Sequence, residues 1–270
     1  MKKLISLALA TVAACGAFAL TSCSGNTKYV ATDIAAESNE EYAFAIGKTA
    51  TKKTEILAAM DKVIAEISID DIVTYYTAIE ASETPSVSLN FADLSDNTGD
   101  TLQVYTNAEF APFEFRDENN KIVGVDIYIM ELVAEELNMK INFNDIAFDA
   151  IVGKIAEEDN AIGAAGMTVT DERKEKVDFS NAYFSTVQSI ISTEDEAFAT
   201  LEDLKGKKIG VQKGTTGWIL IDEAINSGVL KDTGAEVITY DSGAVAYTAL
   251  KAGKCDVVVI DKLPANKLVK

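Results

Sequence analysis

An arginine stands among small residues and hydroxyls at residues 164–180, where the sequence is AAGMTVTDERKEKVDFS. Arg173 is one of two arginines in the chain. Glycine and alanine let a ligand approach the backbone, and Thr170 followed by acids predicts a helix start. A guanidinium placed here suits a planar anion, which it can hold by two parallel hydrogen bonds. A surface arginine on an ordinary helix is the alternative.

Two other features could contact a charged ligand. The turn KGTTG at 213–217 follows a predicted strand and opens a predicted helix, whose N-terminus attracts anions. Asp261 ends the β-branched stretch CDVVVID, where an acid can bind a cation or cap the next helix. Ligands of α/β proteins bind at the carboxyl ends of strands. Arg173, the turn and Asp261 are therefore expected to face one cleft.

The composition excludes several kinds of chemistry. The chain has no histidine, which rules out histidine-dependent triads and metal sites. The three cysteines form no metal-binding cluster, so no metal or cofactor is expected. The turn at 210–217 lacks the spacing of a phosphate loop. Without Lys2 and Lys3 the net charge is −21, from 22 basic and 43 acidic residues, which disfavours nucleic acid as a partner.

Residues 1–22 are expected to be a signal peptide. A positive start precedes an apolar run at 4–20, which is short for a membrane span. The run ends in LTSC, which resembles the lipobox of bacterial lipoproteins, in which the cysteine becomes the lipidated N-terminus. Cys23 would then carry lipid, with 23–27 as a tether, on the outer face of the cytoplasmic membrane. An uncleaved anchor helix or a chance cysteine is the alternative.

Strands and helices alternate from residue 102 onward. Strands are predicted at 102–107, 121–126, 140–146, 160–168, 207–212, 235–241 and 255–261, with helices at 126–139, 148–158, 215–228 and 242–254. The pattern indicates two α/β lobes with mostly parallel sheets. Before residue 102, the segment 41–68 predicts a strand, a glycine turn and a helix, and 69–79 predicts a second helix. Residues 80–100 have the composition of a linker.

Five stretches resemble the bacterial extracellular solute-binding proteins of family three, the amino-acid receptors of ABC importers. They are TNAEFAPFEF (106–115), VGVDIYIMELVAEELNMKI (123–141), AAGMTVTDERKEKVDFS (164–180), LEDLKGKKIGVQKGTTG (201–217) and CDVVVID (255–261). The resemblance implies an α/β, periplasmic-binding-protein-like fold of type II, with two lobes, a hinge and a ligand cleft. It also implies a monomer that binds a free amino acid and delivers it to a membrane permease without a catalytic step.

The resemblance assigns roles around a zwitterionic ligand, which needs a fixed cation and a fixed anion. Arg173 matches the clamp of the α-carboxylate, and Asp261 matches the residue that takes the α-ammonium. The supporting groups are Gly166, Thr168, Thr215 and Thr216.

The side-chain pocket is assigned in the same way. Phe110 and Phe148 resemble two aromatics that sandwich the ligand side chain, although aromatics in α/β sheets are usually core. Asn107 stands where several relatives that bind basic amino acids carry aspartate, which weakens a lysine or histidine assignment. Gln212 could contact a polar ligand end. A glutamine-like and an arginine-like ligand both remain open.

The order of segments departs from the family. Its closing piece, a strand and two helices like 41–79, comes first here. A circular permutation would give lobe two residues 28–39 and 192–270, and lobe one residues 40–191, with 80–100 joining the old ends. Residues 28–33 would then pair in the sheet of 207–212, and 42–46 in that of 102–107. An unrelated extension on a truncated chain is the alternative.

Two other functions compete with an importer receptor. Some dehydratases resemble these receptors, and Glu109 is the one spare acid with a clear placement. A sensory ligand-binding protein is the third hypothesis, although it usually needs a spanning helix into a signalling module.

Overall fold

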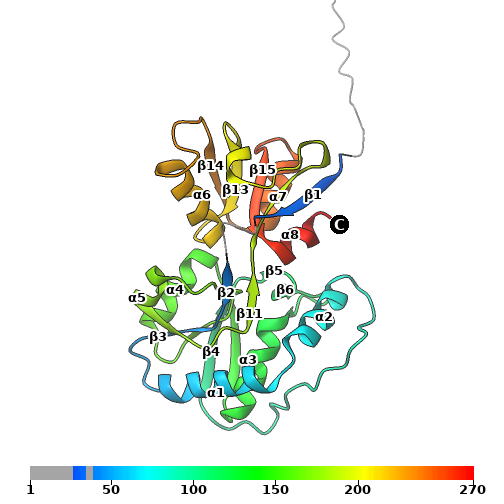
Figure 1. The fold of residues 1–270 in the computed structure, drawn as a ribbon. Coiled ribbons are helices and arrows are strands. Elements are labelled where there is room, and N and C mark those ends of the chain that lie inside the picture. Colours follow the sequence, from blue (N-terminus) through cyan, green and yellow to red (C-terminus); the bar gives the residue numbers. More distant parts are fainter. Residues whose placement is uncertain (1–26, 35–38) are drawn as a thin grey trace, which may run out of the picture.

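The computed structural model describes residues 27–34 and 39–270. The expected signal peptide 1–22 and Cys23 lie outside the described residues. The described chain forms two α/β lobes stacked one above the other, joined by a narrow two-stranded ribbon (Figure 1). Within the described ranges, none of the helices is long and apolar enough to cross a membrane.

Lobe one is built on a five-stranded sheet with helices on both faces. Its strands, in spatial order, are β10 (Val177–Phe179), β3 (Ala45–Gly47), β9 (Ile162–Gly163), β4 (Thr101–Thr106) and β8 (Lys140–Asp145). A small sheet adds β5 (Glu109–Phe110), β6 (Glu114–Arg116) and β7 (Ile122–Val123). The helices are α1 (Lys53–Glu66), α2 (Ile69–Glu80), α3 (Val125–Glu136), α4 (Phe148–Glu157) and α5 (Asp171–Lys176).

Lobe two repeats this arrangement. Its sheet contains, in spatial order, β1 (Tyr29–Asp33), β12 (Gln188–Thr193), β15 (Val257–Asp261), β13 (Lys208–Gln212) and β14 (Glu236–Tyr240). Its helices are α6 (Thr216–Asn226), α7 (Gly243–Lys251), α8 (Lys262–Leu268) and two short 3-10 helices, η1 (Glu194–Glu196) and η2 (Leu201–Leu204). One apolar cluster joins α6 to one face of the sheet, and another joins α7 and α8 to the opposite face.

The two crossings between the lobes lie side by side. β2 (Glu40–Tyr42) pairs antiparallel with β11 (Phe184–Thr186), and together they form the ribbon (Figure 1). The strand expected at 42–46 is therefore divided between the ribbon and β3. β12 already belongs to the sheet of lobe two from Gln188, where it pairs with Asp261. The lobe boundary expected at 192 is thus too late, because ladder pairing begins four residues earlier.

The expectation of mostly parallel sheets holds for strand direction, because four of the five strands in each large sheet run the same way and one is reversed. Each large sheet has two parallel and two antiparallel pairings. In each sheet a single strand makes both antiparallel pairings, β3 in lobe one and β12 in lobe two, and each of these strands directly follows a crossing. Two predicted strands are shorter than expected. The stretch 121–126 ends at β7 because α3 starts at Val125. The stretch 160–168 pairs over β9 and again at Thr168, which forms an isolated bridge with Tyr42.

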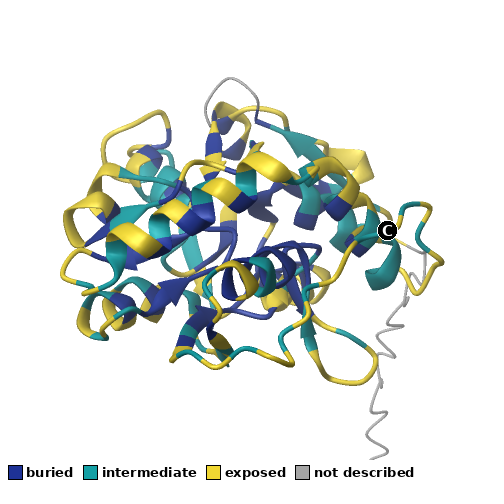
Figure 2. Cartoon of the chain, turned by 90° about the horizontal axis from the view of Figure 1, so that it is seen from below, coloured by how far each residue is buried: buried dark blue, intermediate teal, exposed yellow. Residues whose placement is uncertain are grey.

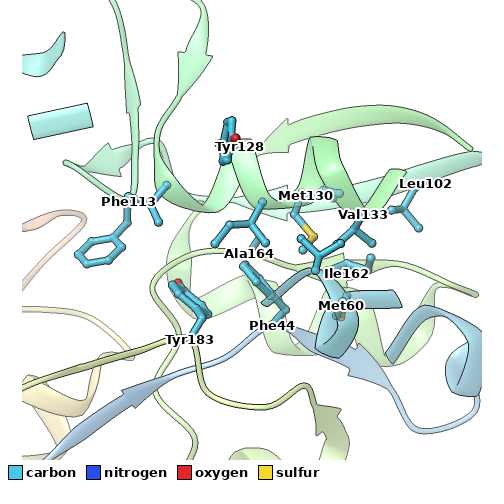
Figure 3. Close-up of a cluster of buried hydrophobic side chains, with 14 of the residues drawn as sticks. Phe44, Met60, Leu102, Phe113, Tyr128, Met130, Val133, Ile162, Ala164 and Tyr183 are labelled. Atoms are coloured by element: carbon cyan, nitrogen blue, oxygen red, sulfur yellow. The ribbon is translucent and has the colours of Figure 1, made fainter. Parts of the chain in front are cut away.

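Residues 42–79 supply part of the core of lobe one. Buried residues gather in the sheets and on the inner helix faces, while loops are exposed (Figure 2). Figure 3 shows Phe44 beside Tyr183, with stacked rings whose centroids are 4.6 Å apart. Met60 of α1 lies in the same cluster as Met130 of α3. Burial of this kind contributes about 25 cal/mol per Å² of apolar surface, so α1 and α3 stabilise the lobe together.

The segment 81–100 has no helix or strand, as the composition of 80–100 predicts. It nevertheless follows the surface of lobe one closely. The Tyr128 hydroxyl donates a hydrogen bond to the Asn90 carbonyl at 2.7 Å, and the Asn97 amide donates to the Met139 carbonyl at 2.7 Å. Phe91 packs edge-on against Tyr128. These contacts dock the segment on the helices of lobe one.

Candidate ligand-binding site

A small cavity between the lobes brings together the ten residues that the sequence analysis assigned to ligand binding. Its free volume is about 20 Å³, room for about one water molecule. It is lined by Asn107, Phe110, Phe148, Gly166, Thr168, Arg173, Gln212, Thr215, Thr216 and Asp261, together with Glu114 and Ala165. The lobes are thus closed on each other, and an amino acid can enter only when they move apart.

Arg173 is buried beside this cavity, so the surface alternative is wrong. The Thr170 hydroxyl caps α5 by accepting the Arg173 backbone N–H at 3.2 Å, which fixes the first turn. Nη1 donates to the Thr168 carbonyl at 2.6 Å, and Nη2 donates across the lobes to the Gly214 carbonyl at 3.1 Å. The guanidinium lies 5.4 Å from the centre of the Phe148 ring. Burial lowers the pKa of Arg173 to about 10, so it remains charged near neutral pH.

Asp261 faces the cavity from lobe two, at the end of β15. It precedes α8 but makes no side-chain cap hydrogen bond, so capping does not explain it. It is 6% exposed, and its Oδ1 has no hydrogen-bond partner among the described residues. Burial and the nearby charge of Glu40 raise the pKa of Asp261 to about 7, while Tyr42 and Gln188 act to lower it. A cation placed at this carboxyl would stabilise its charged form.

The N-terminus of α6 completes the lobe-two wall. The Thr215 hydroxyl accepts the Trp218 backbone N–H at 3.2 Å and donates to the Gln212 carbonyl at 2.8 Å, which anchors the turn. The Thr216 hydroxyl accepts from the Gln188 amide at 3.4 Å. The helix N-terminus contributes partial positive charge on the Arg173 side of the cavity.

Aromatic rings and amides line the rest of the cavity. Phe110 and Phe148 are half-buried, so neither is simply core. Gly166 has φ +50°, and an added Cβ would lie 2.7 Å from the Phe110 ring, so glycine lets the ring pack on the backbone. The Gln212 amide donates to Asn107 Oδ1 at 2.9 Å across the lobes and to the Asp241 carbonyl at 3.2 Å.

Glu114 is a cavity residue that the sequence argument missed. It is fully buried, and neither carboxyl oxygen has a hydrogen-bond partner among the described residues. Burial and the nearby Asp126 raise the pKa of Glu114 well above its ordinary value. Its position between Phe113 and Phe115 was the available signal, because an acid between buried aromatics is costly without a purpose. Glu109, the spare acid of the enzyme hypothesis, is exposed and lines no part of this cavity.

Asp126 supports the site from behind. Its carboxylate accepts the Gly166 backbone N–H at 2.9 Å and the Tyr183 hydroxyl at 2.5 Å. Burial raises the pKa of Asp126 to about 7, although these two donors act to lower it. The bond to Gly166 holds the loop that leads to Thr168. Within the described ranges, no acid or cysteine cluster has an arrangement that could hold a metal ion.

Two α/β lobes, a ribbon hinge and a closed polar cavity between them define a two-lobed solute-binding fold of the periplasmic-binding-protein type. Residues 102–233 match the bacterial extracellular solute-binding proteins, family 3. The chain belongs to this family.

Three similar proteins illustrate the likeness. The L-cystine-binding protein TcyJ of Escherichia coli (strain K12) is 30% identical over 172 residues, which cover 63% of this chain and 62% of TcyJ. The chain thus matches less than two thirds of that relative's length. A solved ancestral arginine-binding protein bound to arginine is 41% identical, with TM-score 0.57, over 63% of this chain and 73% of that one. An ancestral arginine-binding protein bound to glutamine is 38% identical, with TM-score 0.56, over 64% of this chain and 74% of that one.

Proposed function

We propose that this protein binds a free amino acid with a positively charged side chain between its lobes and presents it to an ABC permease. The observation that carries the proposal is the cavity itself. It places one buried arginine on lobe one opposite one buried aspartate on lobe two, with a second buried acid between aromatic rings. Fixed charges of both signs suit a zwitterion. Each charged end of the ligand then pairs with an oppositely charged side chain, which compensates that side chain for the water it lost on burial.

The proposed roles are those that the family resemblance assigns, and the lining of the cavity supports them. Arg173 and the N-terminus of α6 receive the α-carboxylate, since the guanidinium still has N–H groups to donate. Asp261 receives the α-ammonium, with Gly166 and Thr168 beside it. Phe110 and Phe148 hold the ligand side chain between their faces.

Two polar groups that line the cavity, Gln212 and Glu114, bear on the class of ligand. The side-chain amide of Gln212 donates its two N–H groups to Asn107 and Asp241. Its side-chain carbonyl is left as an acceptor. Glu114 adds an acceptor that gains most from a positive charge. A guanidinium satisfies both, whereas the amide of glutamine offers N–H groups without charge. Arginine is therefore the first candidate and glutamine the second, which agrees with the ligands of the two ancestral proteins.

A thermal-shift and calorimetry screen tests this function. Arginine should raise the unfolding temperature most, because a ligand that binds only the folded form stabilises it by about 2.7 kcal/mol at a hundredfold excess over Kd. Citrulline, the neutral isostere of arginine, should bind more weakly, and agmatine, which lacks the carboxylate, should not bind measurably. The absence of any shift with the twenty amino acids and cystine would refute the proposal.

The remaining parts of the importer assignment rest on the family. A monomeric receptor is inferred, whose two lobes together contact the permease. No chemical step is inferred, because the spare acid Glu109 lies outside the cavity. Recovery of the amino acid unchanged after long incubation tests this against a dehydratase-like enzyme. A sensory role would instead require association with a signalling module rather than a permease.

Lipid attachment at Cys23 is a separate inference from the LTSC stretch. Two acyl chains give stable anchoring where one chain is marginal. Changing Cys23 to alanine should therefore release the protein from the membrane fraction or leave it uncleaved. Mass spectrometry of the membrane-bound mature form provides the check. An unmodified residue 23 in that form would refute lipid attachment at Cys23.

Circular permutation is inferred from the sheets that β1 and β3 join. β1 pairs with β12 at the edge of the lobe-two sheet, and β3 lies inside the lobe-one sheet between β10 and β9. α8, the last helix, packs beside β1, and Lys262 forms an ion pair with Asp33 at 2.6 Å. These pairings support permutation over an unrelated extension, since an extension would not supply an internal strand.

The inference predicts the behaviour of a rearranged chain. Residues 101–270 followed by a short linker and residues 28–80 should fold and bind the same ligand within about tenfold, or about 1.4 kcal/mol. Residues 101–270 alone should not fold, because the lobe-one sheet would lose an internal strand and α1. Circular dichroism and calorimetry on both chains provide the measurement. A stable, ligand-binding 101–270 fragment would favour the unrelated extension.

A further inference from the structure

The lobes meet directly beside the cavity at three residues that do not line it. On lobe two the contact is formed by Lys213 and Gly214, in the turn between β13 and α6. On lobe one it is formed by Asp149, in the first turn of α4. Lys213 Nζ lies 2.7 Å from Asp149 Oδ2. The Gly214 carbonyl accepts the Arg173 Nη2–H at 3.1 Å.

The backbone of Gly214 sits against Asp149 more closely than any side chain would allow. A Cβ added at Gly214 would lie 2.7 Å from the Asp149 Cβ and 3.0 Å from its Cα. One of these atoms is backbone, so rotation of the Asp149 side chain could not relieve the clash. Gly214 also has φ +77°, a conformation that favours glycine.

We propose that Gly214 sets how far the lobes can close, because its bare backbone rests on the first turn of α4 only in the closed state. The proposal rests on the proposed function, since closure matters only for a protein that encloses its ligand. The contact has a direct link to the site. The residue that touches Asp149 also brings its carbonyl to the clamp Arg173, and Thr215 and Thr216 follow it. Full closure therefore positions the N-terminus of α6 beside the clamp.

The close backbone contact, and not the ion pair, is the main element. Lys213 is 64% exposed and Asp149 31% exposed, and exposed ion pairs contribute little. A ligand, by contrast, stabilises the closed state only by its differential affinity for that state. A side chain at 214 that prevents full closure removes contacts to the ligand from the whole lobe-two wall.

Gly214→Ala is the test, and the chain provides a matched control. Gly253 has φ +66°, close to that of Gly214, and an added Cβ there would meet nothing within 4 Å. Gly253→Ala therefore carries the same backbone strain without the clash. Both variants should lower the unfolding temperature to a similar extent. Only Gly214→Ala should weaken arginine binding, by about tenfold or more, and Lys213→Gln should weaken it by less than about fivefold.

Distances between spin labels at positions 174 and 223, exposed on α5 and α6, report closure directly. The native protein and Gly253→Ala should reach a short distance with ligand that Gly214→Ala never reaches. Equal affinity and equal distances in the two glycine variants would overturn the proposal. An equal loss in Lys213→Gln would overturn it as well, because the ion pair would then be the cause. If no amino acid binds the native chain, the proposed function fails, and the label distances without ligand still decide whether Gly214 limits closure.

Discussion

Replacing Arg173 with alanine is expected to weaken arginine binding by about two to three and a half decades. The residue is 8% exposed in the closed structure, so its guanidinium and a bound carboxylate would be desolvated together. Removing one partner of such a pair leaves the other charge buried, which costs about 3–5 kcal/mol. Calorimetry on the variant measures the loss directly.

Arg116, the other arginine, is the matched control. It forms an exposed ion pair with Asp145 at 2.8 Å and lines no part of the cavity. Arg116→Ala should keep affinity within about fivefold, as expected for an exposed pair. Arg173→Lys should recover only part of the loss, because an ammonium lacks the planar fork. Affinity near the native value for Arg173→Ala, in a variant that still folds, would contradict the clamp.

Most residues that line the cavity could be named from the sequence because they lie at the ends of helices and strands. Arg173 follows a capping threonine, the KGTTG turn opens a helix, and Asp261 ends a buried strand. Parallel strands direct all such ends to one edge of a sheet, so local patterns were enough to predict one cleft. The resemblance then added Phe110 and Phe148, which local patterns alone assign to the core.

Long-range features could not be predicted in the same way. The one reversed strand of each sheet, β3 or β12, depends on how the chain enters the lobe after a crossing, which no local period encodes. Glu114 escaped notice because hydrophobic neighbours on both sides indicate only a buried strand. The close contact of Gly214 with Asp149 joins residues of different lobes, and a glycine in a turn has several ordinary explanations.

Affinity for arginine is expected to rise with pH up to about pH 7 and then level off. The reason is Asp261, whose pKa burial and Glu40 raise to about 7. The α-ammonium binds only the charged carboxylate, so binding below pH 7 must release a proton. The affinity should fall by up to about tenfold for each pH unit below 7. Calorimetry between pH 5 and 8.5, in buffers of different ionisation enthalpy, measures affinity and proton release together.

Asp261→Asn separates this group from Glu114, the other acid that lines the cavity, and from the buried acids Glu40 and Asp126. The variant should bind arginine more weakly at pH 8 by about tenfold or more, and most of its pH dependence should be lost. Asp256→Asn is the control, because Asp256 is exposed at the opposite end of the same strand. A native pH profile in Asp261→Asn would assign the proton to Glu114 or Asp126 instead.

The stability of the unliganded protein should change in the opposite direction. A carboxyl with an ordinary pKa of 3.8 and a folded pKa of about 7 binds more protons when folded. Its contribution to stability is therefore full below about pH 4 and is lost as the pH rises to about 7. Asp126 acts in the same window and direction. Asp261→Asn should thus flatten the decline of the unfolding temperature between pH 5 and 7 while weakening binding. If Asp261→Asn makes the protein more stable at pH 7 but weakens ligand binding, then the charge of Asp261 serves binding and not folding.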